Sequence, residues 1–342
     1  MDTASFVFPA VKGVQANRNY YVSMVPLDVM SKVFQFADEE LPPELRSQRI
    51  LNKSRIPEIR DYILCNPENY VFSALTVSVD GEICFEPASD ALSQVGTIQI
   101  PMTSRFLIND GQHRKAAISE AIKMNPALKH EHISVVFYQD EGLSRSQQMF
   151  SDLNRFAIKP TKSINILYNT REESSVIAKK VIDDVEVFKG VVEKERTAIS
   201  NRSKAMFTLS AICTATDELL SGIVLPLNDR VSLATSYWTS VGEHIKEWNQ
   251  VKEGVLKPSD VRKEYICTLS ITLVALGYAG NSIIQTEPDR WHLFLNKLDA
   301  IDWHKTNPAW ENLVFVNGKV AANRSTQKVM SSYIRSILCE EQ

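Results

Sequence analysis

The stretch that most constrains the fold runs from Ser104 to Ile118, because it joins an apolar strand end to a helix through one tight turn. An Asp-Gly pair often marks a β-hairpin, but the residues after this turn do not alternate between apolar and polar. Apolar residues recur instead at helical spacing, at Ala117, Ile118, Ala121 and Ile122. The sequence therefore predicts a strand, a turn and a helix in succession.

The start of this predicted helix carries an unusual set of charges. Gly111 can adopt a positive φ and bring backbone N–H groups close to a ligand, while Asp110 is expected to cap the helix. Arg114 and Lys115 oppose the helix dipole in the first turn, at a cost of about 0.3–1 kcal/mol each. A bound anion would offset that cost, and phosphate is common at such turns. The turn therefore predicts a phosphate site to which Arg114 contributes.

Length and composition limit the classes of protein that remain. A chain of 342 residues with 44% hydrophobic content predicts two domains with substantial cores. Its five cysteines include no C-x-x-C pair, so neither a zinc site nor a disulfide framework is indicated. The apolar runs are too short for a membrane span, which predicts a cytoplasmic protein without membrane contact. Because the net charge is −3, nucleic-acid binding would have to come from local basic patches.

The first 168 residues mix strands and helices in an irregular order. Strands are predicted at 20–26, 70–79, 83–85, 97–100, 105–108 and 133–138, and helices at 27–36, 44–64, after Gly111, at 143–156 and at 164–168. The Asp80-Gly81 pair is expected to form a hairpin turn between the strands at 70–79 and 83–85. No G-x-G-x-x-G and no G-x-x-x-x-G-K-[ST] pattern is present, which argues against Rossmann and P-loop folds.

Beyond residue 168 the strand signals nearly vanish. Helices are predicted at 171–188, 203–221, 231–248, 259–276, 290–301 and 323–338. The segment 190–205 is expected to be a mobile polar connection, and loops of this kind often carry function. Its bases are Lys194, Arg196, Arg202 and Lys204. The predicted class is therefore α+β, with a mixed domain at 1–168 and an all-helical domain at 169–342.

Two segments carry an excess of positive charge. Glu44–Arg60 holds five bases and two acids, and Ser144–Ser163 holds four bases and one acid. Each segment is explained either as a solvated helix surface or as a basic face beside the phosphate-binding turn. The second interpretation predicts a DNA contact by Arg49, Lys53, Arg55, Arg155, Lys159 and Lys162.

The sequence offers little for catalysis or metal binding. The histidines and cysteines are too scattered to predict a metal site, and no G-x-S-x-G elbow is present. Asp110 and His113, one helical turn apart, are the candidates for proton transfer at a phosphate ester. Capping and hydrogen bonding by the same pair is the simpler interpretation, so no catalytic residue is assigned.

The residues from Asp110 to Arg114 read Asp-Gly-Gln-His-Arg, which is the signature of DGQHR-domain proteins. Together with Leu-Asn-Lys-Ser-Arg-Ile-Pro-Glu-Ile at 51–59 and Phe-Ser-Asp-Leu-Asn-Arg at 150–155, it makes the chain resemble the DndB family of DNA phosphorothioation systems over nearly its whole length. DGQHR domains are in turn similar to the ParB/sulfiredoxin-like fold, in which the turn after a strand and the following helix bind nucleotide phosphates.

This resemblance implies a transcriptional repressor that binds double-stranded DNA at the promoter of its own modification gene cluster and does not itself transfer sulfur. It implies a phosphate or nucleotide pocket formed by Asp110, Gly111, Gln112, His113, Arg114, Asn154 and Arg155. A homo-oligomer, and contacts with other phosphorothioation proteins, are further expectations.

Two functions of different classes stay open at this point. The first is the DNA-binding repressor, with the turn holding a nucleotide or the DNA backbone. The second is a nucleotide triphosphatase or nuclease in which Asp110 and His113 act on a phosphate ester, with a nucleotide and Mg²⁺ as cofactors. The sequence favours the repressor over the enzyme, because two-metal phosphoryl chemistry usually needs several carboxylates and the motif holds one.

Overall fold

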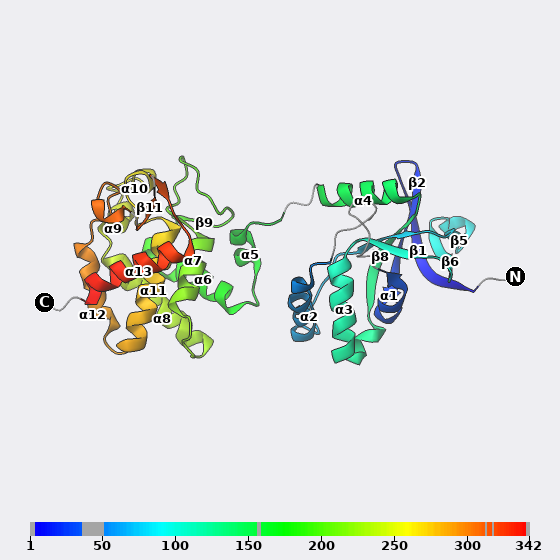
Figure 1. Cartoon of the computed structure of the whole chain (residues 1–342), viewed down its shortest axis with the longest axis horizontal. Helices are drawn as coiled ribbons and strands as arrows, with labels where there is room; N and C mark the ends of the chain where they lie inside the picture. The colour runs from blue at the N-terminus through cyan, green and yellow to red at the C-terminus, as the bar shows by residue number, and fades with distance from the viewer. Residues whose placement is uncertain (1–3, 36–50, 156–158, 312, 317, 340–342) are drawn as a thin grey trace. The chain divides into compact units, whose positions relative to one another are not determined.

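The computed structural model describes residues 4–35, 51–155, 159–311, 313–316 and 318–339. Its internal contacts divide the chain into two units, Met1–Ile158 and Lys159–Gln342 (Figure 1). The first unit mixes strands and helices and the second is mostly helical, which confirms the predicted α+β class. The division comes before residue 162 and not at 168, because α5 (Lys162–Tyr168) packs against helices of the second unit.

An eight-stranded mixed sheet organises the first unit, in the order β3-β7-β4-β8-β2-β1-β6-β5. The strands are β1 Ser5–Gln15, β2 Arg18–Pro26, β3 Phe34–Gln35, β4 Leu75–Val79, β5 Cys84–Pro87, β6 Val95–Pro101, β7 Phe106–Asp110 and β8 His132–Gln139. β4 lies parallel to β8 and antiparallel to β7. The end of β7, which carries the Asp-Gly-Gln-His-Arg turn, therefore lies beside the start of β4.

The hairpin predicted across Asp80-Gly81 is wrong. β4 pairs with β7 and β8, whereas β5 pairs with β6. Every residue of β4 is buried, so this strand belongs in the middle of the sheet, and burial on both faces outweighs the local turn signal. The Asp80 backbone N–H donates to the Arg105 carbonyl at 3.2 Å, which fixes the turn against the start of β7.

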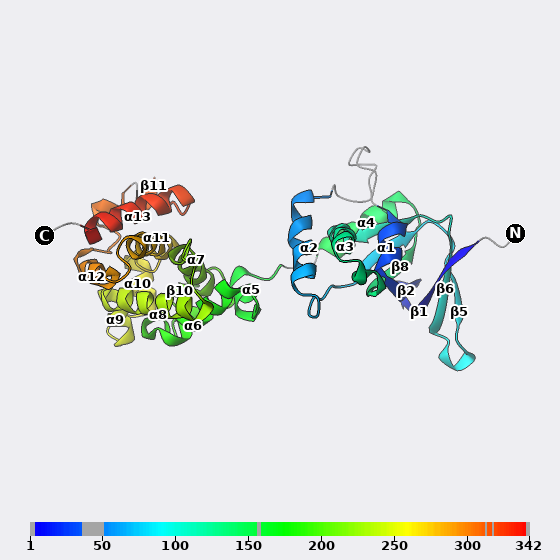
Figure 2. The same cartoon turned by 90° about the horizontal axis from the view of Figure 1, so that it is seen from below.

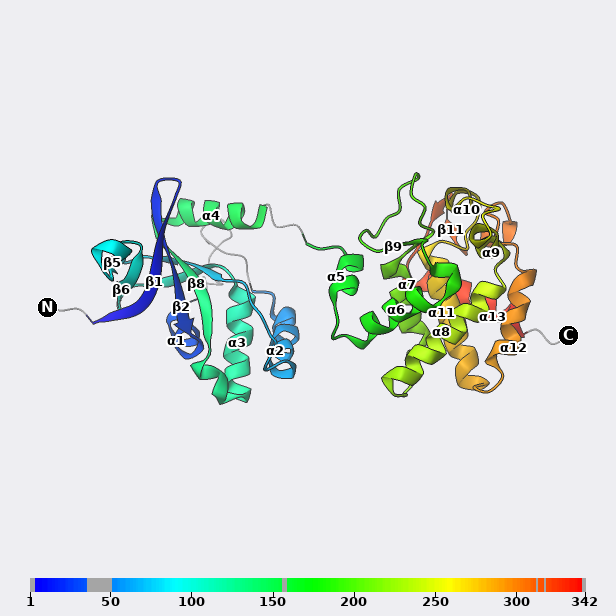
Figure 3. The ribbon, with the colours of Figure 1, turned by 180° about the vertical axis from the view of Figure 1, so that it is seen from behind.

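The sequence did not predict β1, which forms a hairpin with β2 (Figure 3). The turn residues Ala16 and Asn17 both have positive φ, at 50° and 62°, as a two-residue type I′ turn requires. Because Ala-Asn is a weaker turn signal than Asn-Gly, the hairpin is hard to see in the sequence.

Three helices pack on the sheet through one shared core: α1 (Leu27–Val33), α2 (Ile56–Cys65) and α3 (Gln112–Met124). The predicted apolar face of α3 is confirmed, since Ala117, Ile118, Ala121 and Ile122 are buried. Figure 2 shows α2 beside α3, and an ion pair of 3.4 Å joins Arg60 to Glu120 across them. The helix α4 (Leu143–Arg155) lies apart from these three and packs against β7 (Figure 1). Short 3-10 turns are η2 Lys53–Arg55, η3 Asp90–Leu92 and η4 Pro126–His130.

The second unit is built around α11 (Ser270–Thr286), which is buried on nearly all sides. Its other helices are α5, α6 Glu173–Asp184, α7 Leu209–Leu219, α8 Leu227–Glu243, α9 Lys246–Lys252, α10 Pro258–Glu264, α12 Trp291–Leu295 and α13 Arg324–Cys339, with 3-10 turns η5 Glu186–Phe188, η6 Asn296–Ala300 and η7 Pro308–Trp310. α7 and α13 pack directly on α11. At the α7 contact, a Cβ on Gly277 would lie 2.2 Å from the Ala215 carbonyl oxygen, so the two helices approach closely.

Several predicted helices in this unit are shorter than expected. The prediction at 203–221 begins only at Leu209, and those at 231–248 and 259–276 are each divided into two helices. Two pairs of two-residue strands are added: β9 Val192–Glu193 with β10 Phe207–Thr208, and β11 Phe315–Val316 with β12 Lys319–Val320. The segment 190–205, expected to be mobile, is tied to Arg262 of α10 through four backbone carbonyls. None of the described helices reaches the length and apolar character that a bilayer crossing requires.

Candidate functional site

The turn after β7 has the backbone conformation that the sequence predicts. Gly111 has φ +105° and is the N-cap residue of α3. The expected cap residue Asp110 is wrong: the N-cap residue is Gly111, which has no side chain, and the Asp110 carboxylate accepts from Arg114 instead. The first turn of α3 also contains no acidic residue. The cap residue itself therefore supplies no side-chain acceptor at the N-terminus of α3, and helix N-termini are favourable positions for an anion.

Arg114 binds groups of the protein itself. Its Nη2 donates to Asp110 Oδ2 at 2.6 Å, and its Nη1 donates to Ser73 Oγ at 2.8 Å and to the Ala74 carbonyl at 2.9 Å, with a further bond to the Ser73 carbonyl. The Arg114 side chain is 16% exposed. These bonds hold the start of α3 to the segment that leads into β4, and Asp110 compensates the arginine charge that opposed the helix dipole.

Asn109 connects the turn to α4. The ladder between β4 and β7 pairs Val77 with Ile108 and Thr76 with Asp110, so Asn109 is an extra residue in a β-bulge. Its buried side chain donates through Nδ2 to Ser78 Oγ at 2.5 Å and approaches Met149 Sδ of α4 at 3.1 Å. The bulge thus directs Asn109 toward α4, which packs against the same strand that carries the turn.

A hydrogen bond joins the first basic segment to the turn. The Asn52 backbone N–H donates to His113 Nε2 at 3.1 Å, and Asn52 Oδ1 in turn caps η2 by accepting from Ser54 N–H at 3.1 Å. η2 carries Lys53 and Arg55, which are exposed and form no ion pair within the described ranges. The structure therefore brings these two predicted bases to the start of α3. Arg49 lies outside the residues that the structure describes.

Two further side chains of the turn are buried. Gln112 and Lys115 are 7% and 8% exposed, so neither side chain extends freely into solvent. Burial, with a smaller contribution from Lys123, lowers the pKa of Lys115. A cation in this position adds positive potential beneath the N-terminus of α3.

The second basic segment is shared between the two units. Asn154 and Arg155 lie at the C-terminal end of α4 in the first unit, and Asn154 Nδ2 donates to the Phe150 carbonyl of its own helix at 2.8 Å. Lys159 and Lys162 belong to the second unit, where Thr161 caps α5 by accepting from Ile164 N–H at 3.2 Å.

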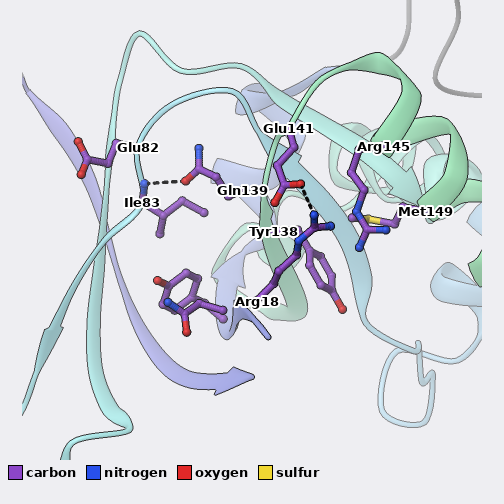
Figure 4. A pocket seen from close by; sticks show the side chains of 10 residues that line it. Arg18, Glu82, Ile83, Tyr138, Gln139, Glu141, Arg145 and Met149 are labelled. Carbon is purple, nitrogen blue, oxygen red and sulfur yellow. Dashed lines mark hydrogen bonds and ion pairs between the residues drawn. The ribbon is translucent and has the colours of Figure 1, made fainter. Parts of the chain in front are cut away.

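A polar pocket of about 320 Å³ lies at the C-terminal ends of β4 and β8, at the opposite end of these strands from the turn (Figure 4). Its walls include Arg18, Tyr21, Glu82, Tyr138, Gln139, Glu141, Arg145 and Met149. Arg18 Nη2 lies 2.8 Å from Glu141 Oε2, and Gln139 Oε1 accepts from Ile83 N–H at 3.2 Å. Sequence reasoning missed this pocket, because its residues come from four separate segments. Two arginines face two glutamates in it, so it presents no excess charge that would attract a polyanion.

No group of three or more His, Cys, Asp and Glu side chains forms a metal-ligand cluster in the part of the chain that the structure describes. His113 accepts a hydrogen bond from Asn52, and Asp110 is bonded to Arg114. Both candidates for proton transfer are thus engaged with protein groups.

Comparison with known proteins connects this chain to one family. A family model named DndB and described as DNA-sulfur modification-associated matches residues 8–340. No curated protein and no solved structure matches the chain, so the likeness to the ParB/sulfiredoxin fold stays a prediction. The match spans both structural units and includes the turn, η2 and α4. The chain belongs to the DndB family, which is associated with DNA sulfur modification.

Proposed function

We propose that this protein is a DNA-binding repressor of the genes for DNA sulfur modification, with the N-terminus of α3 as a site for a backbone or nucleotide phosphate. One observation carries the proposal: the Asn52–His113 hydrogen bond ties η2, which carries the exposed Lys53 and Arg55, to the first turn of α3. Helix N–H groups and neighbouring cations together form a typical contact with a phosphate backbone. Family membership supports a function connected with DNA sulfur modification.

Within this proposal the residues of the turn have separate roles. Gly111 adopts the positive φ that is needed at the N-cap of α3. Arg114 bonds to Asp110 and to the Ala74 carbonyl, and so holds the turn against the segment before β4. The phosphate contact is assigned to the N-terminus of α3 together with Lys53 and Arg55 from η2. Arg155, Lys159 and Lys162 are proposed as additional contacts, and the protein is proposed to act on its own promoter as a homo-oligomer, with other phosphorothioation proteins as partners.

The enzyme alternative, a nucleotide triphosphatase or nuclease with Mg²⁺, has weaker support. A general base must be within hydrogen-bond reach of the proton that it abstracts. The Asp110 carboxylate lies 2.6 Å from Arg114 Nη2 and would have to leave this ion pair to act on a water molecule. Hydrolysis of the four NTPs or of DNA by the wild-type protein, lost in Asp110→Asn, would replace the repressor proposal with the enzyme.

Replacing Lys53 and Arg55 together with alanine is expected to weaken binding to duplex DNA and to make its salt dependence shallower. Each phosphate contact contributes a slope of about −0.9 in a plot of log K against log salt, so the double variant should be shallower by about 2. The measurement is fluorescence anisotropy of the full chain with a labelled duplex taken from upstream of the modification genes, over a range of salt concentrations.

A matched control removes two charges from the other end of α3. Lys123 and Lys129 are exposed bases at the end of α3 and in η4, so Lys123→Ala with Lys129→Ala alters net charge equally but leaves η2 intact. Its slope is expected to equal that of the wild type. An equal loss in both double variants would show a general charge effect and remove η2 from the DNA contact.

Repression itself is tested with a reporter gene behind the DNA upstream of the modification genes. We expect wild-type protein to lower reporter output and the Lys53→Ala/Arg55→Ala protein to do so much less at equal protein level. Unchanged reporter output with wild-type protein, despite DNA binding in vitro, would contradict the repressor proposal.

A further inference from the structure

A loop of the second unit presents a group of exposed cations. It leaves β9 (Figure 1) and leads to β10 (Figure 2). It carries Lys194, Arg196, Arg202 and Lys204, all exposed. Lys194 lies 3.8 Å from Asp183, and no ion pair is formed by the other three within the described segments. These charges are therefore directed to solvent and available to a partner.

The backbone of this loop is fixed by one arginine. Arg262 donates through Nη1 to the Ser203 carbonyl at 3.0 Å and to the Ala205 carbonyl, and through Nη2 to the Ser200 carbonyl at 2.9 Å and the Asn201 carbonyl at 3.2 Å. Burial lowers the pKa of Arg262. Removing a guanidinium from water has a desolvation cost, and the hydrogen bonds from Arg262 to the loop carbonyls offset this cost. The same hydrogen bonds hold the loop in one conformation.

The start of α5 is bonded to the other side of the same loop. Thr161 Oγ1 donates to the Glu195 carbonyl, and the buried Ser163 donates through Oγ to the Arg196 carbonyl at 2.9 Å. Lys159 and Lys162, both exposed, flank these anchors in the sequence. The six cations of this joined surface form what we call the basic platform: Lys159, Lys162, Lys194, Arg196, Arg202 and Lys204.

The acids within this surface do little to neutralise it. Glu193 and Glu195 are the acidic residues of the loop, and Glu193 Oε1 accepts from the backbone N–H groups of Glu195 at 3.1 Å and Arg196 at 3.3 Å. Lys194 is also paired with Asp183, and Lys162 Nζ donates to Thr214 Oγ1 at 2.8 Å. Lys159, Arg196, Arg202 and Lys204 form no ion pair within the described residues, so the surface keeps an excess of positive charge in a chain whose net charge is −3. A local excess of this kind attracts polyanions even when the whole protein is acidic.

We propose that the basic platform binds the sugar–phosphate backbone of double-stranded DNA and that Arg262 is the residue that positions it. The proposal rests on the proposed function and names a DNA contact in the helical unit, separate from the α3 site. Spread, exposed cations on a fixed backbone suit a row of phosphates better than one small anion, because a single anion needs convergent donors. The contact is therefore expected to be independent of base sequence.

The first test removes two platform charges in the full chain, as Arg202→Ala with Lys204→Ala. The slope of log K against log salt should become shallower by about 2, equally for the upstream duplex and for a scrambled duplex of the same composition. The matched control, Arg290→Ala with Lys328→Ala, removes two exposed cations elsewhere on the same unit and should leave the slope unchanged.

The outcomes separate the platform from the proposed function. A wild-type slope in the platform variant, with DNA binding intact, overturns the platform and leaves the DNA-binding function standing. No duplex binding by the wild-type protein at low salt overturns the proposed function itself. Competition by polyglutamate as effective as that by duplex DNA at equal charge overturns the assignment to a nucleic-acid backbone.

The second test addresses the positioning by Arg262. Arg262→Gln removes no platform cation, yet it should make the salt slope shallower and speed tryptic cleavage after Arg202 and Lys204. Arg262→Lys, which restores a charged donor, should recover part of both effects. Faster cleavage with a wild-type slope would show that the loop conformation is irrelevant to binding and would remove Arg262 from the proposal. Tryptophan fluorescence verifies that the second unit stays folded, because all five tryptophans lie in it.

Discussion

Replacing Arg114 with alanine is expected to lower the free energy of unfolding of the first unit by about 2–3 kcal/mol. The loss has a definite origin, because Arg114 donates to the carbonyls of Ser73 and Ala74 and to Asp110. Without the guanidinium, carbonyl groups at the entry to β4 lose their donor. The expected loss stays moderate because the Asp110 side chain is 46% exposed. Water can therefore solvate the Asp110 carboxylate when the Arg114 guanidinium is removed.

The location of the tryptophans makes this measurement specific. All five tryptophans lie in the second unit, so urea unfolding followed by their fluorescence should be unchanged in Arg114→Ala. The transition followed by far-UV circular dichroism should gain an earlier phase, and hydrogen exchange should speed up in β4 and α3. Arg60→Ala is the matched control, because Arg60 pairs with Asp61 and Glu120 and donates to no backbone carbonyl in the described residues. If Arg60→Ala destabilises the first unit as much as Arg114→Ala, the loss cannot be attributed to backbone carbonyls that have lost their donor.

The same variant separates the phosphate contact that the sequence predicts for Arg114 from the bonds that its guanidinium makes to Ser73, Ala74 and Asp110. Phosphate binding by the folded fraction of Arg114→Ala, measured by calorimetry with inorganic phosphate, is expected to persist if the helix N–H groups make the contact. Complete loss of phosphate binding in a variant that is still folded would instead assign the contact to the guanidinium.

Replacing Gly111 with alanine is expected to lower the stability of the first unit by about 2–4 kcal/mol. Two causes add at this position. An alanine at φ +105° carries the strain of a left-handed conformation, and its Cβ would lie 2.2 Å from Leu75 Cδ2, which belongs to a fully buried residue of β4. The loss of stability is measured by urea unfolding followed by circular dichroism, and we expect faster hydrogen exchange in α3.

A second glycine of this unit isolates the first cause. Gly142 has φ +101°, but a Cβ there would meet no atom within 4 Å. Gly142→Ala should therefore show the backbone strain alone, about 1–2 kcal/mol. If both variants lose the same free energy of unfolding, Leu75 must move away from the new Cβ without destabilising the protein. The close packing of the turn on β4 would then contribute nothing measurable to stability.

Local sequence patterns were sufficient to predict the elements whose buried residues recur at the spacing of a helix or a strand. The face of α3, the strand β8 and the positive φ of Gly111 were all predicted from residues within one or two turns of each other. Errors arose where long-range pairing decides the outcome. The Asp80-Gly81 hairpin failed because β4 finds its partners in β7 and β8. β1 was missed for a local reason, because its turn, Ala16-Asn17, lacks a glycine.

The candidate site divides in the same way. The Asp-Gly-Gln-His-Arg stretch and the excess of bases at 53–55 are visible in the sequence, and the family match agrees with the resemblance that they suggested. No local pattern states that Asn52 meets His113 across 61 residues, or that Arg262 holds the carbonyls of Ser200 and Ser203. These bonds depend on how α2 packs on α3 and on how α10 meets the loop after β9.

The sequence by itself determined the strand, turn and helix at Asp110–Arg114, the α+β class and the family, because these depend on residue type and short-range period. Only the tertiary structure decided what each charge of the turn contacts. An arginine in a first helical turn is equally compatible with a phosphate or with a carboxylate and backbone carbonyls, and the choice depends on which acceptors the fold brings within 3 Å. Here those acceptors are Asp110, Ser73 and Ala74, so the Arg114 guanidinium holds the turn against the segment before β4.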